Sequence, residues 1–208
     1  MNLVALAAVI GATTAVNLQT VMLKPAEVGT GYGVYARNDG FGVKAAPTLD
    51  LCGRSGYASE KLRVDRLQVN YLRKKTTLGL SNELVRYKTG GAAKAISEVR
   101  QHAATCPAHA VKTGESGVPV AKFTITPVHD KKLLPGAVAV KVRAVATVKG
   151  KKYDQVSYAV YQQLGDVLSG VYSFGPDTPA QLRFALHAAE QSARALRRVV
   201  HPSKGPPA

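Results

Sequence analysis

Only two cysteines occur in this 208-residue chain, Cys52 and Cys106, and they stand far apart. The chain also carries 28 Lys and Arg against 13 Asp and Glu. An isolated, widely separated pair in such a domain favours one long-range disulfide, and with it an oxidising compartment. Two free buried thiols are the alternative. A zinc site is disfavoured because two cysteines are too few ligands and the five histidines follow no ligand spacing.

The composition fits one globular domain with a complete core, since 46% of the residues are hydrophobic and 20% are charged. A disulfide would then add to the stability that the hydrophobic core provides and would not be its main source. The sequence shows no internal repeat and no interdomain linker. We therefore expect residues 17–200 to form a single domain and residues 201–208, which are rich in proline, to form a flexible tail.

The first residues have the character of an export segment. Residues 3–16 (LVALAAVIGATTAV) are apolar and small, like the core of a signal peptide, although no basic residue precedes them. The run is too short to span a bilayer, so no transmembrane span is expected. Two interpretations stay open for residues 1–16, a truncated export signal or an N-terminal helix that packs on the domain. We favour the export-related segment, and hence a secreted or envelope-associated protein.

The formal net charge is +15 at pH 7. Two blocks supply most of it: residues 54–75 hold seven Lys and Arg against two acids, and residues 131–152 hold seven with no acid. Such a field attracts polyanions, including nucleic acid, anionic lipid headgroups and phosphate-rich polymers. The alternative is a basic surface that serves only solubility.

Six segments have the alternation or the length of β-strands. The clearest is residues 137–149, in which Val138, Val140 and Val142 alternate with Lys141 and Arg143. The expected strands are residues 62–73, 78–88, 121–127, 137–149, 153–164 and 167–174. Residues 29–42 are rich in glycine and are expected to form a loop.

Helical periodicity appears at residues 92–104, and again from the capping box Thr178-Pro179-Ala180-Gln181 to residue 200. A short helix is expected within residues 17–23, before Pro25. Together these elements predict an α+β fold: a central antiparallel sheet of about six strands, packed with helices and carrying one disulfide.

Three runs of sequence resemble a group of secreted actinobacterial proteins: Ser59 to Tyr71, Leu80 to Arg100, and Cys106-Pro107. They are similar to the PknH-like extracellular sensor domain, which occurs on mycobacterial membrane kinases and on free lipoproteins. The segment from Leu23 to Val28 resembles the opening of that family, so the resemblance covers roughly residues 17–200. It implies an α+β sandwich-like domain with a central antiparallel sheet, a cleft for an unknown ligand, export and a disulfide.

No catalytic signature appears in the sequence. The Gly-x-Ser-x-Gly elbow of serine hydrolases is absent, and the glycine-rich run at residues 29–33 lacks the Lys-Ser/Thr of a phosphate loop. Among the few acids, Glu83 lies in an expected strand near Arg86, where an ion pair is favoured over half of a glycosidase pair. We therefore predict a protein that is not an enzyme and that uses no cofactor and no metal.

The candidate ligand-binding residues are cations and tyrosines of the expected strands. Tyr158 and Tyr161 have opposite parity, so one should face the core while the other lines a groove. Lys141 and Arg143, on the preceding strand, suit a sugar or a phosphate-bearing headgroup. The alternative is that the tyrosines only cover the sheet. The full candidate set is Arg66, Tyr71, Arg73, Arg86, Lys141, Arg143, Tyr158 and Tyr161.

These features predict an extracytoplasmic, non-enzymatic ligand-binding or sensor-like domain. Its expected partner is an anionic component of the cell envelope: a lipid headgroup, a phosphate-rich polymer or a glycan. The alternative is a secreted interaction module, such as an inhibitor or an accessory subunit, that docks an acidic protein. Nucleic acid is a partner that the positive charge would allow, but an exported protein is not expected to meet it.

Overall fold

One antiparallel sheet of seven strands, in the order β1-β2-β3-β7-β6-β5-β4, organises the molecule. The structure is a computed structural model that describes residues 16–39, 47–74, 76, 78–112 and 119–200. The strands are β1 (Tyr32–Asp39), β2 (Arg63–Arg73), β3 (Gly79–Tyr87), β4 (Ala121–Val128), β5 (Val138–Val148), β6 (Lys151–Leu164) and β7 (Val167–Gly175). The helices are α1 (Leu18–Val21), α2 (Pro25–Val28), the 3-10 helix η1 (Ala58–Leu62), α4 (Gly91–Ala104) and α5 (Pro179–Val200). The predicted α+β class is confirmed.

The sheet has one strand more than the six expected, because β1 lies in the glycine-rich segment that was expected to be a loop. That expectation is wrong. Gly29 and Gly31 take positive φ just before the strand, and the register against β2 shifts between Val34 and Ala36. A bulge and glycines together remove the two-residue alternation that marks a strand in a sequence. β1 forms an edge of the sheet.

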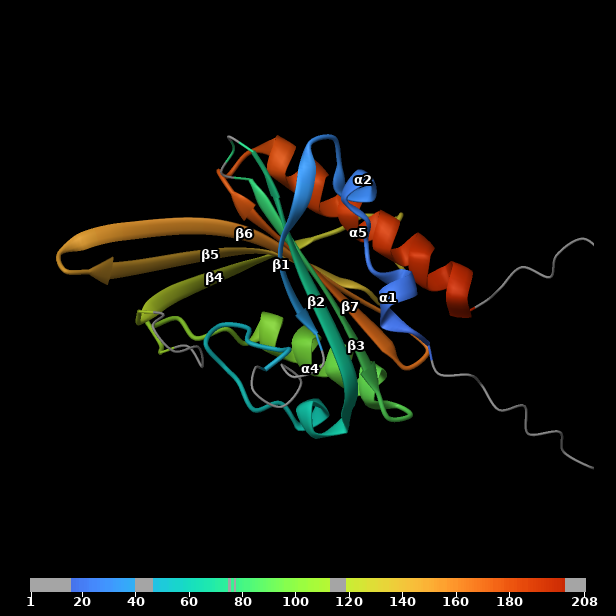
Figure 1. Ribbon diagram of the computed structural model, residues 1–208. Helices are drawn as coiled ribbons and strands as arrows, with labels where there is room; N and C mark the ends of the chain where they lie inside the picture. Colours follow the sequence, from blue (N-terminus) through green and yellow to red (C-terminus); the bar gives the residue numbers. More distant parts are fainter. Residues whose placement is uncertain (1–15, 40–46, 75, 77, 113–118, 201–208) are drawn as a thin grey trace, which may run out of the picture.

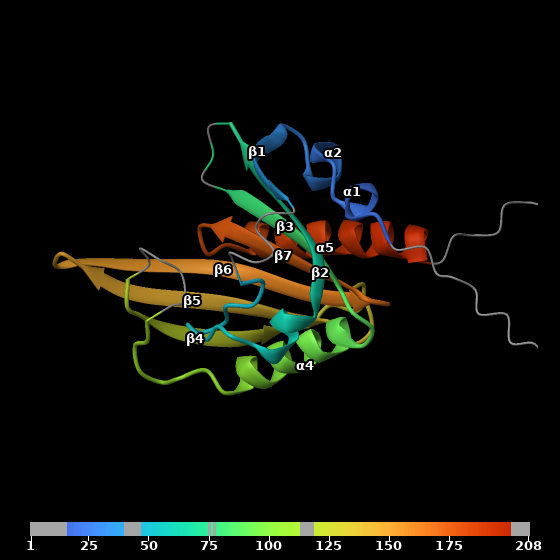
Figure 2. The ribbon, with the colours of Figure 1, turned by 60° about the horizontal axis from the view of Figure 1, so that its bottom comes forward.

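Helices cover both faces of the sheet (Figure 1). One face, here called the α5 face, packs against α5, α1 and α2 and buries Leu67, Val69 and Tyr71 of β2. The other, here called the α4 face, packs against α4 and buries Val85 and Leu168. Figure 2 shows α4, with the segment that precedes β2, against this second face. Both faces of the central strands are therefore core.

The N-cap half of the predicted capping box is found at the start of α5, where Thr178 Oγ1 accepts a hydrogen bond of 3.2 Å from the backbone N–H of Gln181. The Gln181 side chain bonds the carbonyls of Val156 and Ser173 instead. The face of α5 that meets the sheet is made of small residues, which let the helix lie close to β6 and β7. The fully buried alanines are Ala185, Ala188, Ala189 and Ala193. The hydroxyls of Ser169 on β7 and Ser192 on α5 are 2.7 Å apart and hydrogen-bonded, which fixes the helix along the strand.

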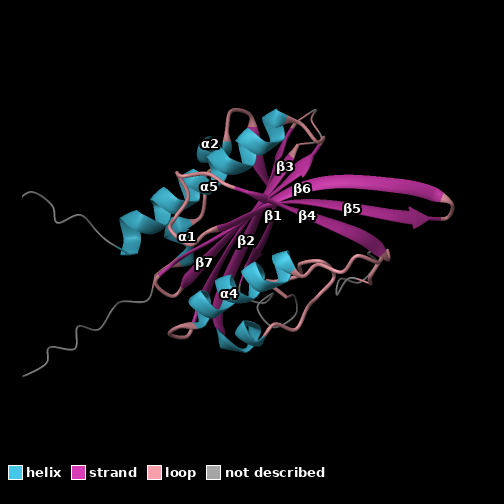
Figure 3. Cartoon of the chain, turned by 180° about the vertical axis from the view of Figure 1, so that it is seen from behind, coloured by secondary structure: helices cyan, strands magenta, loops and turns pink. Residues whose placement is uncertain are grey.

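The outer parts of β4, β5 and β6 project beyond the helices as an arm (Figure 3). We define the arm as residues 121–126, 141–148 and 151–158. At its tip the β5–β6 hairpin turns through Lys149 and Gly150, both with positive φ. The arm lies at one end of the molecule, and α1 and the last turn of α5 lie at the other (Figure 1).

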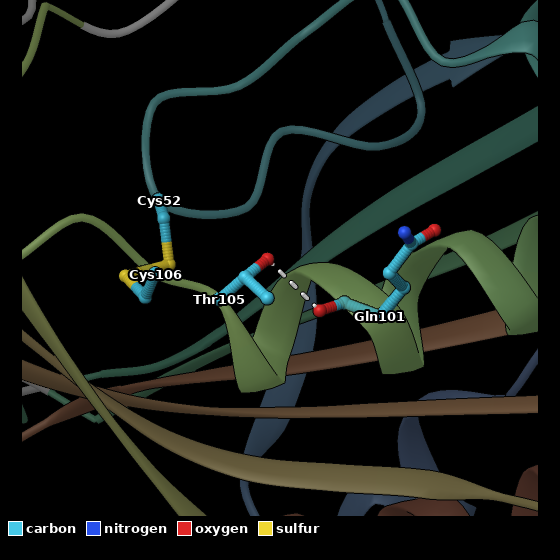
Figure 4. The surroundings of a disulfide bond; sticks show 4 residues. All are labelled: Cys52, Gln101, Thr105 and Cys106. Atoms are coloured by element: carbon cyan, nitrogen blue, oxygen red, sulfur yellow. Dashed lines mark hydrogen bonds between the residues drawn. A yellow bond between two sulfur atoms is a disulfide. The ribbon is translucent and has the colours of Figure 1, made fainter.

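Cys52 and Cys106 form the predicted disulfide, with an S–S distance of 2.09 Å and a Cα–Cα distance of 5.6 Å. It ties residues 47–57 to the end of α4 (Figure 4). Just before Cys106, the Thr105 hydroxyl donates to the Gln101 carbonyl at 3.0 Å and closes the last turn of the helix. Leu49 and Leu51 are buried in the same cluster as α4. The disulfide thus fixes a long connecting segment over the sheet.

Among the described helices, none is long and apolar enough to cross a membrane. Residues 1–15, which hold most of the expected export segment, and the expected tail at 201–208 lie outside the described residues.

Candidate functional site

The eight candidate residues do not form a single site. Strand register places Arg66 and Tyr161 on the α4 face and the other six on the α5 face. Tyr158 and Tyr161 lie on opposite faces of β6, as the alternation predicts, but both are buried, Tyr158 beside Ala185 of α5 and Tyr161 in the cluster under α4. Lys141 lies directly across from Tyr158 in the sheet. The structure brings Lys141, Arg143 and Tyr158 together on the α5 face. On the α4 face it links Arg66 and Tyr161 through Glu83 and Tyr172.

Three other candidates on the α5 face lie apart from this group. Tyr71 is 1% exposed and donates its hydroxyl proton to the Leu23 carbonyl, and burial raises the pKa of that phenol. Arg86 pairs with Asp65 at 3.7 Å. Arg73 is exposed at the end of β2, across from β1. Tyr71 and Arg86 therefore serve contacts within the domain.

Two carboxylates neutralise the paired cations of β5. Lys141 Nζ donates to Asp177 at 2.7 Å, and the Tyr158 hydroxyl donates to the other oxygen of that carboxylate at 3.4 Å. Arg143 makes a two-point contact with Asp154, whose first hydrogen bond measures 2.8 Å. The hydrogen bond that Lys141 donates to Asp177 raises the pKa of Lys141, and the one that Arg143 donates to Asp154 lowers the pKa of Asp154. These pairs are partly exposed, so each contributes little to stability.

Further cations surround these two pairs on the arm. Lys122 and Lys152 lie on the same face as Lys141 and Arg143, because each pairs in register with a residue of that face. Lys149 and Lys151 stand at the tip. Within the described residues, these four lysines form no ion pair. We call Lys122, Lys141, Arg143 and Lys152 the basic face of the arm.

A buried polar cluster on the α4 face was not predicted as a unit. Arg66 and Glu83, 4% and 2% exposed, form an ion pair. Tyr172 donates to Glu83 at 3.1 Å, and Arg66 donates to Gln68 at 2.9 Å. Burial raises the pKa of Glu83, and Arg66 opposes that rise. The prediction that Glu83 forms an ion pair is right, but its partner is Arg66. Arg86, three residues along the strand, lies on the opposite face.

His102 of α4 is a second buried titratable group, packed against Tyr57 with ring centroids 4.6 Å apart. Its Nδ1 has no hydrogen-bond partner among the described residues. Burial, aided by Arg54, lowers the pKa of His102, while Glu98 acts in the opposite direction.

The folded protein should therefore lose stability as pH falls through the ordinary pKa of histidine, about 6.5, because the unfolded chain takes up the proton first. The variant His102→Phe should lose less stability than the wild type between pH 7.5 and pH 5. Urea unfolding of both proteins across that range measures the difference. Parallel pH profiles would contradict this role for His102.

A hollow of about 320 Å³ opens at the connection between β4 and β5. Its polar lining residues include His129, Asp130 and Lys131. It contains none of the eight candidate residues. No group of three or more His, Cys, Asp or Glu in the described part of the chain could hold a metal ion.

Comparison with known proteins shows a likeness in fold. No protein-family model matches the chain, and no relative is found among curated proteins. The crystal structure of the extracellular domain of PknH from Mycobacterium tuberculosis is similar, with a TM-score of 0.55 over 85% of this chain and 94% of that chain. The two sequences are 12% identical. The resemblance stated above therefore holds at the level of a distant shared fold.

Proposed function

We propose that this chain is an extracytoplasmic, sensor-like domain that binds a phosphate-bearing component of the cell envelope on the basic face of its arm. The observation that carries the proposal is the gathering of six cations on the arm and its tip, with Asp154 and Asp177 as their acidic partners. The disulfide, which requires an oxidising compartment, supports the location. The fold shared with an extracellular domain supports it as well.

The spacing of the cations favours a ligand with several separated negative charges. Neighbouring strands lie about 4.8 Å apart, and Lys122, Arg143 and Lys152 lie on three neighbouring strands at different register positions, so their charges are spread over the basic face. A phosphate-rich polymer and a membrane of anionic lipids both present repeated phosphates at such intervals. Each unpaired ammonium near an anionic surface contributes about 1 kcal/mol to binding. The domain acts by binding rather than by catalysis.

Replacing both Lys122 and Lys152 with glutamine should weaken binding about 30-fold, the sum of two such contributions. Binding of the full chain is measured over a salt series to inorganic polyphosphate and to vesicles of phosphatidylcholine with phosphatidylglycerol. The polymer and the vesicles distinguish the two sources of phosphate. The control, Lys88→Gln/Lys94→Gln, removes two exposed cations outside the arm and should bind as the wild type does. Equal losses in both variants would mean that only net charge matters, and would refute a site on the arm.

Two further variants of the same site should act in opposite directions. Asp154→Asn/Asp177→Asn frees Arg143 and Lys141 from their partners and should strengthen binding to the same probes. Lys141→Gln/Arg143→Gln leaves two unpaired carboxylates on the basic face and should weaken it. A change of the same sign in both variants would rule out direct contact between the ligand and this face.

A second candidate function, a module that docks an acidic protein, is favoured by the free edge of the sheet. β1 exposes Val34 and Tyr35 to 55% and 74%. An edge strand of this kind can accept a strand from another polypeptide. Recovery of one stoichiometric protein partner, lost on replacing Tyr35 with lysine, would favour this function over binding to an envelope phosphate.

A further inference from the structure

The two faces of the arm differ in chemistry. On the α5 face the strands carry the charged residues Lys122, Lys141, Arg143, Lys152 and Asp154. On the α4 face the same described strands carry no charged side chain except Lys151 at the tip. The other residues there are Ala121, Phe123, Ile125, Val142, Ala144, Ala146, Val148, Tyr153, Gln155 and Ser157. The net charge of the chain is +15, yet this face of the sheet is nearly uncharged.

Part of this neutral surface is open to solvent beyond α4, and it continues onto β7 and β2. Tyr153, Phe174 and Leu72 are 53%, 41% and 39% exposed. Gly79 lies between Leu72 and Phe174 in the register. Because Gly79 has no side chain, Leu72 covers it, with Cδ2 3.0 Å from the position that a Cβ would take. We define the neutral patch as Asn70, Leu72, Ala144, Val148, Tyr153, Gln155, Ser157 and Phe174.

The polar groups of the neutral patch are free to bind. Within the described residues, the side chains of Asn70, Gln155 and Ser157 make no hydrogen bond. In contrast, Gln68 and Ser81 on the same face are hydrogen-bonded to each other at 2.9 Å. An amide side chain offers two donors and an acceptor, and a hydroxyl offers both kinds of group. The patch thus combines exposed rings with neutral hydrogen-bonding groups that are not bonded to other described side chains or backbone.

We infer that the neutral patch binds an uncharged saccharide chain. The rings of Tyr153 and Phe174 offer flat apolar surface for the C–H faces of sugar rings, and the free amides and hydroxyl match sugar hydroxyl groups. The absence of charge on the patch matches a neutral ligand. From Leu72 on β2 to Ala144 on β5 the patch spans about 19 Å, and from Tyr153 to Ser157 about 13 Å.

The size of the patch also favours an elongated small ligand over a protein. A standard protein interface covers about 800 Å² on each partner, which is well above the extent of this patch. The inference stands apart from the proposed function, because the neutral patch and the basic face lie on opposite sides of the same strands. One arm would then hold a neutral sugar chain on one side and a phosphate-bearing group on the other.

The test is a titration of the full chain, labelled with ¹⁵N, with cellohexaose, chitohexaose and mannohexaose. At least one of these neutral probes should shift the backbone amide signals of the neutral patch, with a dissociation constant on the order of 1 mM. Tyr153→Ala/Phe174→Ala should weaken that binding at least about tenfold, since it removes both exposed rings. Tyr35→Ala, which removes a still more exposed ring from β1, should not change it. Lys122→Gln/Lys152→Gln should also leave it unchanged.

Three outcomes would overturn the inference. The first is that none of the probes shifts the patch at about 10 mM, well above the expected dissociation constant. The second is that the shifts map to the basic face. The third is that the patch signals move with protein concentration before any sugar is added, which would mean that a second copy of the chain occupies the patch. Amide spectra of the unbound variants, compared with the wild type, verify that each variant is folded.

Discussion

Replacing Arg66 with methionine is expected to lower the free energy of unfolding by about 3–5 kcal/mol. The substitution leaves Glu83 as a carboxylate 2% exposed, without its cationic partner. The remaining side-chain donors to Glu83 are neutral: the Tyr172 hydroxyl at 3.1 Å and the Thr48 hydroxyl. Denaturant unfolding of the wild type and the variant measures the loss. The matched control is Arg86→Met, which breaks a partly exposed pair with Asp65 and should cost less than about 1 kcal/mol.

The double variant Arg66→Met/Glu83→Leu should recover most of that stability. Apolar side chains of similar volume need no solvation, so replacing a buried ion pair as a whole is often neutral. If the double variant were no more stable than Arg66→Met alone, packing around the pair rather than an unpaired charge would cause the loss.

The deficit of Arg66→Met should also depend on pH. Burial raises the pKa of Glu83 above the ordinary value of 4.5, and loss of Arg66 removes the main opposing interaction. A raised folded-state pKa gives stability that is complete below the unfolded pKa and is lost as pH rises through the folded one. The deficit should therefore be smallest near about pH 4 and grow toward neutral pH. A deficit that is constant over this range would show that Glu83 does not change its protonation state.

Replacing Cys52 and Cys106 with serine should lower the free energy of unfolding by about 4 kcal/mol, the loop-closure contribution of a disulfide of this span. The two cysteines are 54 residues apart. Guanidinium unfolding of the variant and of the oxidised wild type gives the difference. The reduced wild type should have the same free energy of unfolding as the variant. A loss below about 1 kcal/mol would mean that the unfolded chain gains little freedom when the bond is absent.

The location of the effect can be tested separately by hydrogen exchange. In the variant, residues 47–57 and the end of α4 should lose protection, because the bond joins those two segments. β6 and β7 in the centre of the sheet should keep theirs. Equal loss of protection across the sheet would mean that the bond supports the whole fold rather than this segment.

Alternation along the chain predicts the long strands nearly to their ends: the expected strand 137–149 is found as Val138–Val148. It fails for β1, where glycines and a register shift hide the strand. The position of Tyr158 across from Lys141 follows from two strands joined by a tight hairpin. Asp177, which neutralises Lys141, lies in the connection to α5, so sequence alternation carries no sign of it.

The Arg66–Glu83 pair is another contact that alternation in the sequence does not predict. Both residues are visible as strand residues, but their pairing depends on the register of β2 against β3. A shift of one residue would place Arg66 on the other face of the sheet. Alternation along the strands also predicts which residues of the neutral patch share a face. Whether that face is exposed to solvent depends on how far α4 extends over the strands.

The arm and the two ends of the described chain lie at opposite ends of the molecule (Figure 1). Val16 and Val199 both pack against the same core cluster, beside α1 and α5. A tether joined at either end would therefore meet the domain on the side away from the arm. An attachment at that side would orient the arm outward. The arm would then lie one full length of the domain away from the anchoring surface.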